Sequence, residues 1–229
     1  MKQKQPASLS QSCYHRLLYS VIVTNGMKKI ASAGQMDEKA LIAKLIEGDA
    51  AAFEYVVGRY HSLMLSVARA IIGEAFADEV VQDAWVSAIK ALPRFEGRAS
   101  LKTWLLQITS NGAKTRLRRE SRQLSLDDGW QAEPDYKFNQ RGHRIDDVLP
   151  WNIDTPEALL ENEQLRQVIE RSYQNLPPHQ RAVLTMADME GLEMTEICNI
   201  LDLSASNARV LLHRARTALH HSIEQYQES

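Results

Sequence analysis

The stretch SASNARVLLHRARTAL, Ser204 to Leu219, has the spacing of a helix with one apolar and one polar face. Its apolar residues recur at helical intervals and should face inward: Ala208, Leu211, Leu212, Ala215 and Leu219. Its polar residues should face outward: Asn207, Arg209, His213, Arg214 and Arg216. Ser204 is expected to supply the N-cap oxygen. The stretch therefore predicts a helix that packs by one side and presents Asn, His and Arg on the other.

The residues before Ser204 predict two further helices and a tight turn. Leu176-Pro177-Pro178 breaks the chain and places a proline at the start of a helix that Gly191 ends. A short helix, Thr195 to Leu201, follows, and Asp202-Leu203 joins it to the long helix. A short helix, a tight turn and a longer helix with exposed Asn and Arg are typical of a helix-turn-helix unit, which places its second helix in a DNA groove.

The charge of this segment agrees with a DNA-facing surface. No acidic residue occurs from Leu203 to Ile223, as a surface that meets phosphates requires. A helical hairpin with a solvated basic face has the same spacing, and spacing alone does not separate the two interpretations. The order of the residues favours the helix-turn-helix.

The net charge of −2 is the sum of neighbouring segments with opposite charge. The segment from Arg94 to Arg122 holds eight Lys/Arg and two Asp/Glu, whereas Gln123 to Glu157 holds three Lys/Arg and eight Asp/Glu. Basic charge is therefore concentrated where a polyanion could meet it, although the total argues against indiscriminate nucleic-acid binding.

The cysteines and histidines indicate neither a metal site nor catalysis. Cys13 and Cys198 form no CxxC or Cys/His spacing, and Cys198 is expected on the inward side of the short helix, so we expect no structural disulfide and a reducing cytoplasm. The seven histidines form no metal-ligand set, and no nucleophile–base spacing or glycine-rich phosphate loop is visible. We therefore expect a protein that is not an enzyme, with no cofactor, metal or catalytic residue.

Residues 1–36 differ from the rest of the chain. Residues 1–35 hold five Lys/Arg, no acid and one apolar run, Leu17 to Val23, which is far too short to span a membrane. This run and Ala31-Ser32-Ala33 could suggest a secretory signal, but the run is at the short limit and nothing downstream looks secreted. A flexible extension, or an upstream start codon with Met27 or Met36 as the true beginning, is the favoured interpretation. We expect the extension to be dispensable.

Residues 37–122 predict a bundle of four helices without a sheet. The expected boundary residues are Gly48, Asp49, Gly73, Asp78, Leu92-Pro93 and Ser100, with Asp49 and Asp78 as caps of the second and third helices. The expected inward residues are Leu41, Ile42, Leu45, Ile46, Phe53, Val56, Tyr60, Met64, Val67, Ile71, Val81, Ala84, Trp85, Ala88, Leu101, Trp104, Leu105 and Ile108.

Residues 123–157 have the composition of a flexible, self-repelling acidic linker. A helix resumes from Ala158 to Tyr173 and leads into the helix-turn-helix unit. The predicted fold class is therefore all-α, with two small helical domains, 37–122 and 158–229, joined by this linker.

The segment from Leu176 to Arg216, with Leu201-Asp202-Leu203-Ser204 at its turn, closely resembles region 4 of bacterial sigma factors, specifically of the extracytoplasmic-function type. Ala77 to Trp85 is similar to the region 2.2 helix of these proteins. Phe95 to Leu105, followed by Ile108 and Asn111, is similar to their regions 2.3 and 2.4. Two motif sets thus occur in the family's order, separated by an acidic tether.

The resemblance implies a transcription initiation factor that gives RNA polymerase its promoter choice. Four residues would contact core polymerase: Asp78, Glu79, Gln82 and Asp83. A second set would open and bind the −10 element: Phe95, Gly97, Ser100, Asn111, Lys114, Arg116, Arg118 and Arg119. A third set would read the −35 element: Ser204, Ser206, Asn207, Arg209, His213 and Arg214. The implied partners are the polymerase β′ coiled coil and β flap, promoter DNA and an anti-sigma factor, with no membrane insertion.

Two other functions remain as alternatives, and the sequence differs from the family's pattern at two positions. A free-standing helix-turn-helix regulator would need a sensory α/β domain, which the helical first half does not predict, and a nucleic-acid enzyme would need a catalytic set. Asp202 stands where the family's turn often has Gly, which Asp tolerates at positive φ. Leu211 occupies a position at which the family frequently has a basic residue. Trp104 shares its face with apolar neighbours, which favours a core position over a base-stacking one.

Overall fold

The computed structural model describes residues 37–123 and 163–227. The extension predicted at 1–36 and most of the predicted acidic linker lie outside the described residues. Within the described ranges all regular elements are helical and no strand occurs, which confirms the predicted all-α class. No helix in these ranges is long and apolar enough to cross a lipid bilayer.

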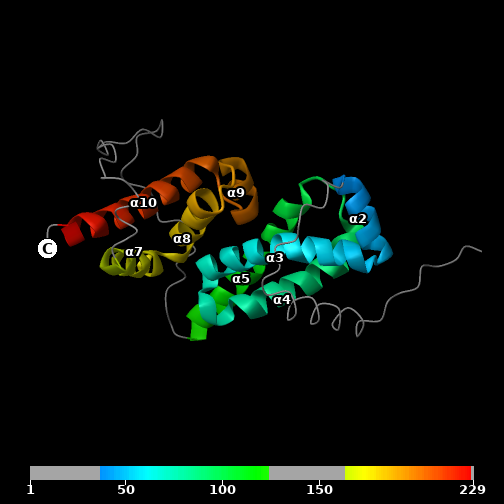
Figure 1. Ribbon diagram of the computed structural model, residues 1–229, viewed down its shortest axis with the longest axis horizontal. Helices are drawn as coiled ribbons and strands as arrows, with labels where there is room; N and C mark the ends of the chain where they lie inside the picture. The colour runs from blue at the N-terminus through cyan, green and yellow to red at the C-terminus, as the bar shows by residue number, and fades with distance from the viewer. Residues whose placement is uncertain (1–36, 124–162, 228–229) are drawn as a thin grey trace, which may run out of the picture.

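The N-terminal domain is the predicted four-helix bundle (Figure 1). Its helices are α2 (Glu38–Glu47), α3 (Ala50–Ile72), α4 (Glu74–Ala91) and α5 (Leu101–Gln123), with a 3₁₀ turn, η1 (Leu92–Arg94), after α4. The long helices α3, α4 and α5 pack on one another, and α2 covers the start of α3.

Glycine and aspartate mark the first boundaries as expected. Gly48 ends α2 in the left-handed conformation at φ 82°, and Asp49 then caps α3 by accepting a 2.9 Å hydrogen bond from the Ala52 backbone N–H. Gly73, at φ 86°, lies between α3 and α4.

The predicted cap of α4 is wrong. The helix begins at Glu74, so Asp78 lies one turn inside it and on its surface. A single glycine at positive φ reverses the chain without a loop, since glycine has no Cβ to clash there. Arg69 and Glu74, on opposite sides of this corner, form a 2.8 Å ion pair.

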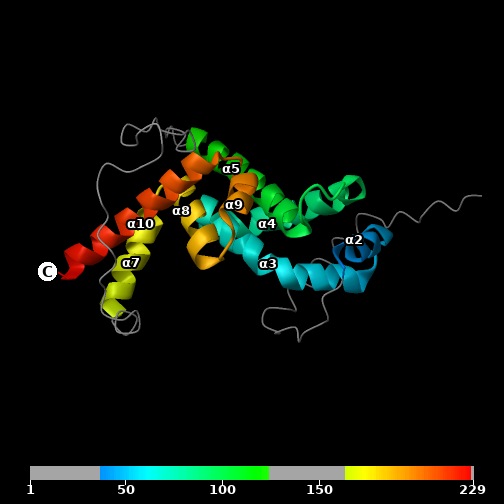
Figure 2. The same ribbon diagram turned by 90° about the horizontal axis from the view of Figure 1, so that it is seen from above.

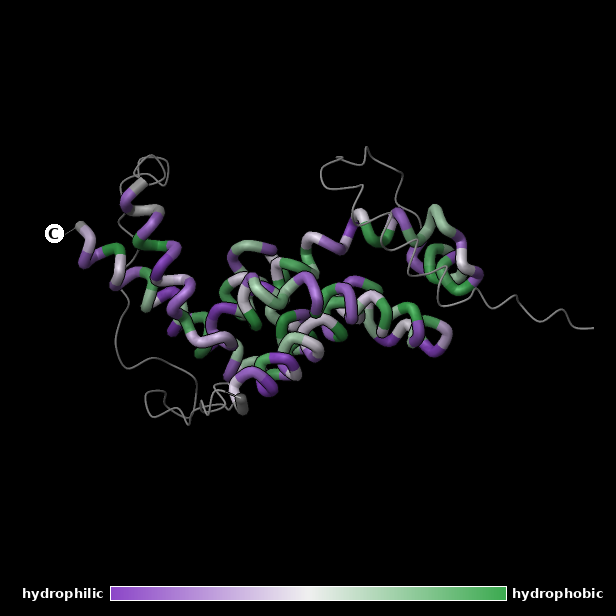
Figure 3. Tube along the Cα trace, turned by 90° about the horizontal axis from the view of Figure 1, so that it is seen from below, coloured by the Kyte–Doolittle hydropathy of each residue, from purple (hydrophilic) through white to green (hydrophobic). Residues whose placement is uncertain are grey.

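The bundle core consists largely of the apolar faces that the helical spacing predicted. Ile46 is an exception: it was predicted to face inward, but it lies in the last turn of α2 and is 49% exposed. Met64, Val67, Ile71 and Val81 are fully buried. Tyr60, Phe53 and Trp104 are partly buried against that core. The hydropathy of the chain in Figure 3 shows apolar and polar residues alternating along each helix.

The C-terminal domain contains the predicted helix-turn-helix. Its elements are α7 (Glu163–Asn175), α8 (Pro178–Leu184), a π-helical turn, η2 (Thr185–Met189), α9 (Met194–Leu201) and α10 (Ala205–Gln227). Pro178 opens α8 as expected, because proline fits the first helical position. The π turn, in which the Glu190 N–H bonds to the Thr185 carbonyl, was not predicted.

The two domains pack against each other. Helix α9 lies beside α5, and α8 lies beside α3 (Figure 2). The guanidinium of Arg181 on α8 is buried, and its Nε donates a 2.7 Å hydrogen bond to the Ala70 carbonyl near the end of α3. Burial lowers the pKa of Arg181. Buried side chains of both domains thereby form one hydrophobic cluster.

Candidate nucleic-acid and polymerase interfaces

The turn before α10 has the expected geometry. Asp202 ends α9 in the left-handed region at φ 57°, the one non-glycine residue with positive φ in the described part of the chain. Ser204 then caps α10, since its Oγ accepts a 3.2 Å hydrogen bond from the Asn207 N–H. Ser206 Oγ lies 3.1 Å from Ser204 Oγ. The N-terminal end of α10 is thus fixed by polar contacts at its surface.

The outward face of α10 carries its basic side chains. Arg209 is exposed, as are Ser204 and Ser206, whereas Asn207, His213 and Arg214 are half-buried. The apolar residues Ala208, Leu211, Leu212 and Ala215 are buried, as the spacing predicted. The helix therefore offers Arg209 near its N-terminal end, the part of a recognition helix that reaches base edges.

Arg216 on α10 is bound within the domain. Its Nε and NH2 donate hydrogen bonds of 2.9 and 2.6 Å to the two carboxylate oxygens of Asp188 in the π turn. This bond raises the pKa of Arg216. The π turn brings Asp188 into reach of α10 and leaves Met189 67% exposed.

A loop between η1 and α5 holds the first members of the predicted −10 set. The Phe95 ring lies against Trp104, with 4.6 Å between ring centroids. Gly97 has φ 68°, and a Cβ there would have no heavy atom within 4 Å. Ser100 caps α5 through a 3.1 Å bond from the Thr103 N–H. The loop therefore places an aromatic ring two residues from the exposed Gly97.

Most of the α5 members of this set face outward. Asn111, Arg118 and Arg119 are exposed. Arg116 is half-buried, and its guanidinium carbon lies 4.6 Å from the centroid of the Phe76 ring.

Lys114 has a different environment from its neighbours on α5. It is only 6% exposed, and its Nζ donates a 2.6 Å hydrogen bond to the Leu201 carbonyl of α9. Burial lowers the pKa of Lys114, and the Asp202 carboxylate opposes this shift. In this arrangement Lys114 contacts the C-terminal domain, and its predicted contact with DNA phosphate stays a prediction.

The predicted polymerase contacts lie together on α4. Asp78, Glu79, Gln82 and Asp83 are all exposed. Glu79 and Asp83 also line a groove of about 380 Å³ between α4 and α5, whose other wall includes Asn111, Arg116 and Arg119.

An ion pair of 3.1 Å between Arg116 NH1 and Glu79 Oε1 joins the two walls of this groove. The structure thus brings part of the predicted polymerase set and part of the predicted −10 set to one place.

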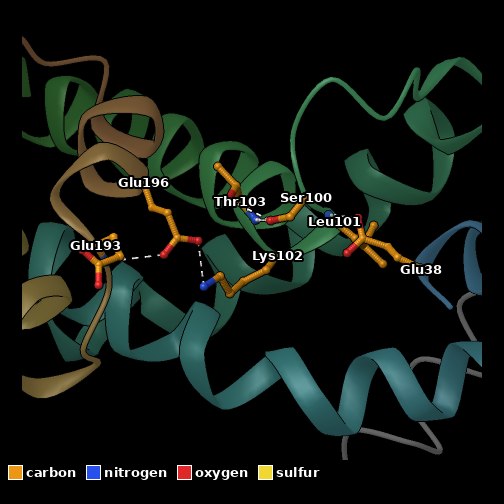
Figure 4. A network of polar contacts seen from close by, with 7 residues as sticks. All are labelled: Glu38, Ser100, Leu101, Lys102, Thr103, Glu193 and Glu196. Carbon is orange, nitrogen blue, oxygen red and sulfur yellow. Dashed lines mark hydrogen bonds and ion pairs between the residues drawn. The ribbon is translucent and has the colours of Figure 1, made fainter. Parts of the chain in front are cut away.

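Besides the bonds of Arg181 and Lys114, three further polar contacts between the domains were not predicted from the sequence. Lys102 forms a 2.8 Å ion pair with Glu196 (Figure 4). Gln107 and Ser110 donate hydrogen bonds to the Asn199 and Ile200 carbonyls. The helical spacing of Gln107, Ser110 and Lys114 places them on one face of α5, but it does not indicate whether that face meets solvent or protein.

No group of three or more His, Cys, Asp and Glu side chains in residues 37–123 and 163–227 could hold a metal ion. Cys198 is half-buried and has a free thiol.

Two family models match the chain. Sigma-70 region 2 matches residues 56–123, and Sigma-70, region 4 matches residues 166–219. The first range covers most of α3 together with α4 and α5, and the second contains α8, α9 and most of α10.

The chain matches curated relatives over nearly their whole length. The ECF RNA polymerase sigma-E factor of Escherichia coli K12 is 30% identical over 190 residues, which is 83% of this chain and 96% of the relative. The protein of the same name from Haemophilus influenzae is 27% identical over 192 residues, 84% and 98% of the two chains.

Two solved structures share the fold. CnrH, in complex with the cytosolic domain of CnrY, has a TM-score of 0.53 and 22% identity, and covers 82% of this chain and 97% of its own. The sigma factor RpoE from Bartonella quintana, crystallised with the anti-sigma factor NepR, has a TM-score of 0.53 and 18% identity, and covers 75% and 96%.

Proposed function

The chain belongs to the extracytoplasmic-function sigma factors of bacterial RNA polymerase, which direct transcription initiation, and from this premise we propose how its surfaces divide the work. The domain of residues 37–122 binds polymerase and opens the −10 element. The domain of residues 158–229 reads the −35 element. Residues 123–157 connect the two.

The −35 element is read by the N-terminal part of α10. Arg209 is exposed there, and arginine can bond a guanine edge in the major groove through two donors. Asn207 lies beside it, and asparagine can pair with adenine in the same way. Positioning contacts with phosphate and sugar are assigned to the cap residue Ser204 and to three residues of α10, Ser206, His213 and Arg214.

The −10 element is opened by the Phe95–Ser100 loop and by α5. Extruding a base costs about a few kcal/mol of unstacking, which stacking and hydrogen bonds to the extruded base offset. The loop supplies Phe95 and the exposed Gly97. Asn111 supplies a donor and an acceptor at the groove between α4 and α5. The basic residues Lys114, Arg116, Arg118 and Arg119 are assigned to the backbone phosphates.

Core polymerase is bound by the acidic face of α4. The exposure of Asp78, Glu79, Gln82 and Asp83 supports this assignment, since an unburied cluster of carboxylates is available to a basic partner. The chain acts as a non-catalytic subunit in the cytoplasm, where polymerase and promoter DNA are found. An anti-sigma factor is an expected partner, because the similar sigma factor RpoE of Bartonella quintana was crystallised with the anti-sigma factor NepR.

The observation that carries this proposal is the occurrence of both sigma regions, in order, in a chain 30% identical to a sigma-E factor. Core-dependent transcription in a purified system tests it. We expect promoter-specific transcripts when the chain is added to core polymerase, and none from core alone. A free-standing regulator would instead bind duplex DNA without core and give no such transcripts.

A further inference from the structure

The first turn of α2 contacts the first turn of α5. Helix α5 begins at Leu101, and the Leu101 N–H is one of the backbone donors that have no acceptor within their own helix. Helix α2 begins at Glu38, whose Oε1 accepts that N–H at 2.9 Å although the two residues are 63 positions apart (Figure 4). One carboxylate therefore lies at the N-terminal ends of two helices, where negative charge is favoured.

Ser100 completes the same turn of α5. Its Oγ accepts the Thr103 N–H at 3.1 Å and lies 2.9 Å from Thr103 Oγ1. This bond is local, whereas the bond of Glu38 comes from a separate helix. The side chain of Leu101 is buried in the bundle core. The start of α5 is thus held by its own cap, by the core and by α2.

The loop from Phe95 to Ser100 ends at this contact. Glu96 and Arg98 are exposed, and their ion pair of 2.6 Å stays within the loop. At the other end of the loop, the Phe95 N–H donates a 3.0 Å hydrogen bond to the Leu92 carbonyl of η1. Helix α2 also packs on η1. Helix α2 therefore contacts both the element before the loop and the element after it.

We propose that Glu38 is a positioning residue for promoter opening, because it fixes the start of α5 and thereby the loop assigned to the extruded base. A loop that is already ordered loses less conformational freedom when its ligand binds. Loss of the bond to Leu101 releases one end of the loop, so strand opening should slow while the preceding closed complex forms normally. The inference rests on the assignment of this loop to the −10 element in the proposed function.

Three substitutions of Glu38 separate its hydrogen bond from its charge. Glu38→Ala removes the acceptor. Glu38→Gln keeps an acceptor oxygen at the same reach without the charge, and Glu38→Asp keeps the charge on a shorter side chain that does not reach the Leu101 N–H. Glu47→Ala, at an exposed position in the last turn of α2, is the matched control that removes the same charge far from the loop.

Strand opening by the holoenzyme, assembled from core polymerase and the full chain, measures the effect. The template is a promoter that the wild-type holoenzyme opens, and the time course of permanganate reactivity gives the opening rate. Gel-shift titration gives the affinity of the closed complex. Hydrogen exchange of the free chain reports the Leu101 amide directly, and circular dichroism checks the fold.

We expect Glu38→Ala to open the promoter about tenfold more slowly than the wild type, since tenfold corresponds to about 1.4 kcal/mol, close to the contribution of one hydrogen bond. Its closed complex should have the wild-type affinity, and a template with a premelted bubble should remove the defect. Glu38→Gln and Glu47→Ala should open the promoter at close to the wild-type rate. The Leu101 amide should exchange faster in Glu38→Ala than in Glu38→Gln.

Opening by Glu38→Ala at the wild-type rate overturns the proposal. Equally slow opening by Glu38→Gln also overturns it, because the charge rather than the hydrogen bond would then matter. A closed complex weakened as much as opening is slowed overturns it as well, since general damage to the bundle gives that result. If Glu38→Ala does not fold, Glu38→Asp takes its place in every comparison.

Asn111→Ala, measured beside these variants, separates failure of this inference from failure of the proposed function. The absence of transcripts with the wild-type holoenzyme refutes the sigma assignment, and wild-type opening by Asn111→Ala refutes the assignment of the −10 surface. Either result also removes the role of Glu38. Slow opening by Asn111→Ala together with normal opening by Glu38→Ala refutes the positioning role alone.

Discussion

Helices α10 and α5 both carry clusters of basic residues, yet they present them differently. Arg209 on α10 is exposed, at the end of a helix that its own domain caps through Ser204. Lys114 on α5 is 6% exposed and caps a helix of the other domain. One candidate DNA surface is open to a ligand and the other is partly occupied by the chain itself. Basic composition thus locates a surface, whereas tertiary packing decides whether it is available.

The largest effect should come from breaking the contact that joins α8 to α3. Arg181→Ala removes two hydrogen bonds from a buried charged group, to the Ala70 and Gln174 carbonyls. Bonds to charged groups contribute about 1.5–3 kcal/mol each, so the free energy of unfolding should fall by about 3 kcal/mol. Urea denaturation measures this, with the exposed Arg171→Ala on α7 as control. Equal stability of the two variants would show that Arg181 does not join the domains energetically.

The next effect should separate the two DNA surfaces directly. Arg209→Ala should weaken holoenzyme binding to duplex promoters by about 1–3 kcal/mol, the value of a good bidentate base contact. Asn111→Ala should spare that closed complex and slow strand opening. A promoter with a premelted bubble should rescue much of the Asn111 defect and little of the Arg209 defect. Permanganate footprinting on both templates measures the difference, and equal rescue of the two variants would remove the division between α5 and α10.

A smaller effect should come from the acidic face of α4, which is assigned to core polymerase. Gln82→Ala combined with Asp83→Arg changes two exposed side chains of α4, so folding should be nearly unchanged. Affinity for core polymerase should fall roughly tenfold, about 1.4 kcal/mol. A core-enzyme pull-down tests this, with Lys90→Glu on the same helix as control. Undiminished binding of the double variant would remove the assignment of α4 to polymerase.

The smallest effect concerns pH and the N-terminal domain alone. His61 Nδ1 accepts a 3.2 Å hydrogen bond from Trp85 Nε1, and burial lowers the pKa of His61. The folded state therefore favours neutral His61, and its stabilising contribution is complete above the ordinary pKa of about 6.5 and is lost as the pH falls. The free energy of unfolding should decrease between pH 7 and pH 5. His61→Gln should show a shallower decrease in the same denaturation series, and an unchanged slope would contradict this role.

The helices and most of their boundaries could be predicted because local sequence determines them. Apolar spacing located α3 and α10, Asp49 and Ser204 indicated caps, and Asp202 was expected to tolerate positive φ. Asp78 was misassigned because the sequence around an aspartate is similar whether it caps a helix or lies one turn inside it. The conformation of Gly73 shows that α4 begins at Glu74, before Asp78.

The environment of Lys114 could not be predicted for a different reason. Its partner carbonyl belongs to Leu201, which is distant along the chain, and a lysine on a basic helix has the same pattern whether it meets water, phosphate or another helix. The same holds for Ser110, whose burial depends on the docking of α9. The predicted site residues were therefore located on their helices, but their availability depended on contacts between the domains.

The capping of α9 also has a consequence for the order of folding. An isolated helix shorter than about 12–15 residues is only marginally stable in water, and α9 spans Met194 to Leu201. Since its end is completed by α5, α9 gains stability from a bundle that is synthesised before it. We therefore expect the C-terminal domain to fold against an N-terminal domain that has already been synthesised.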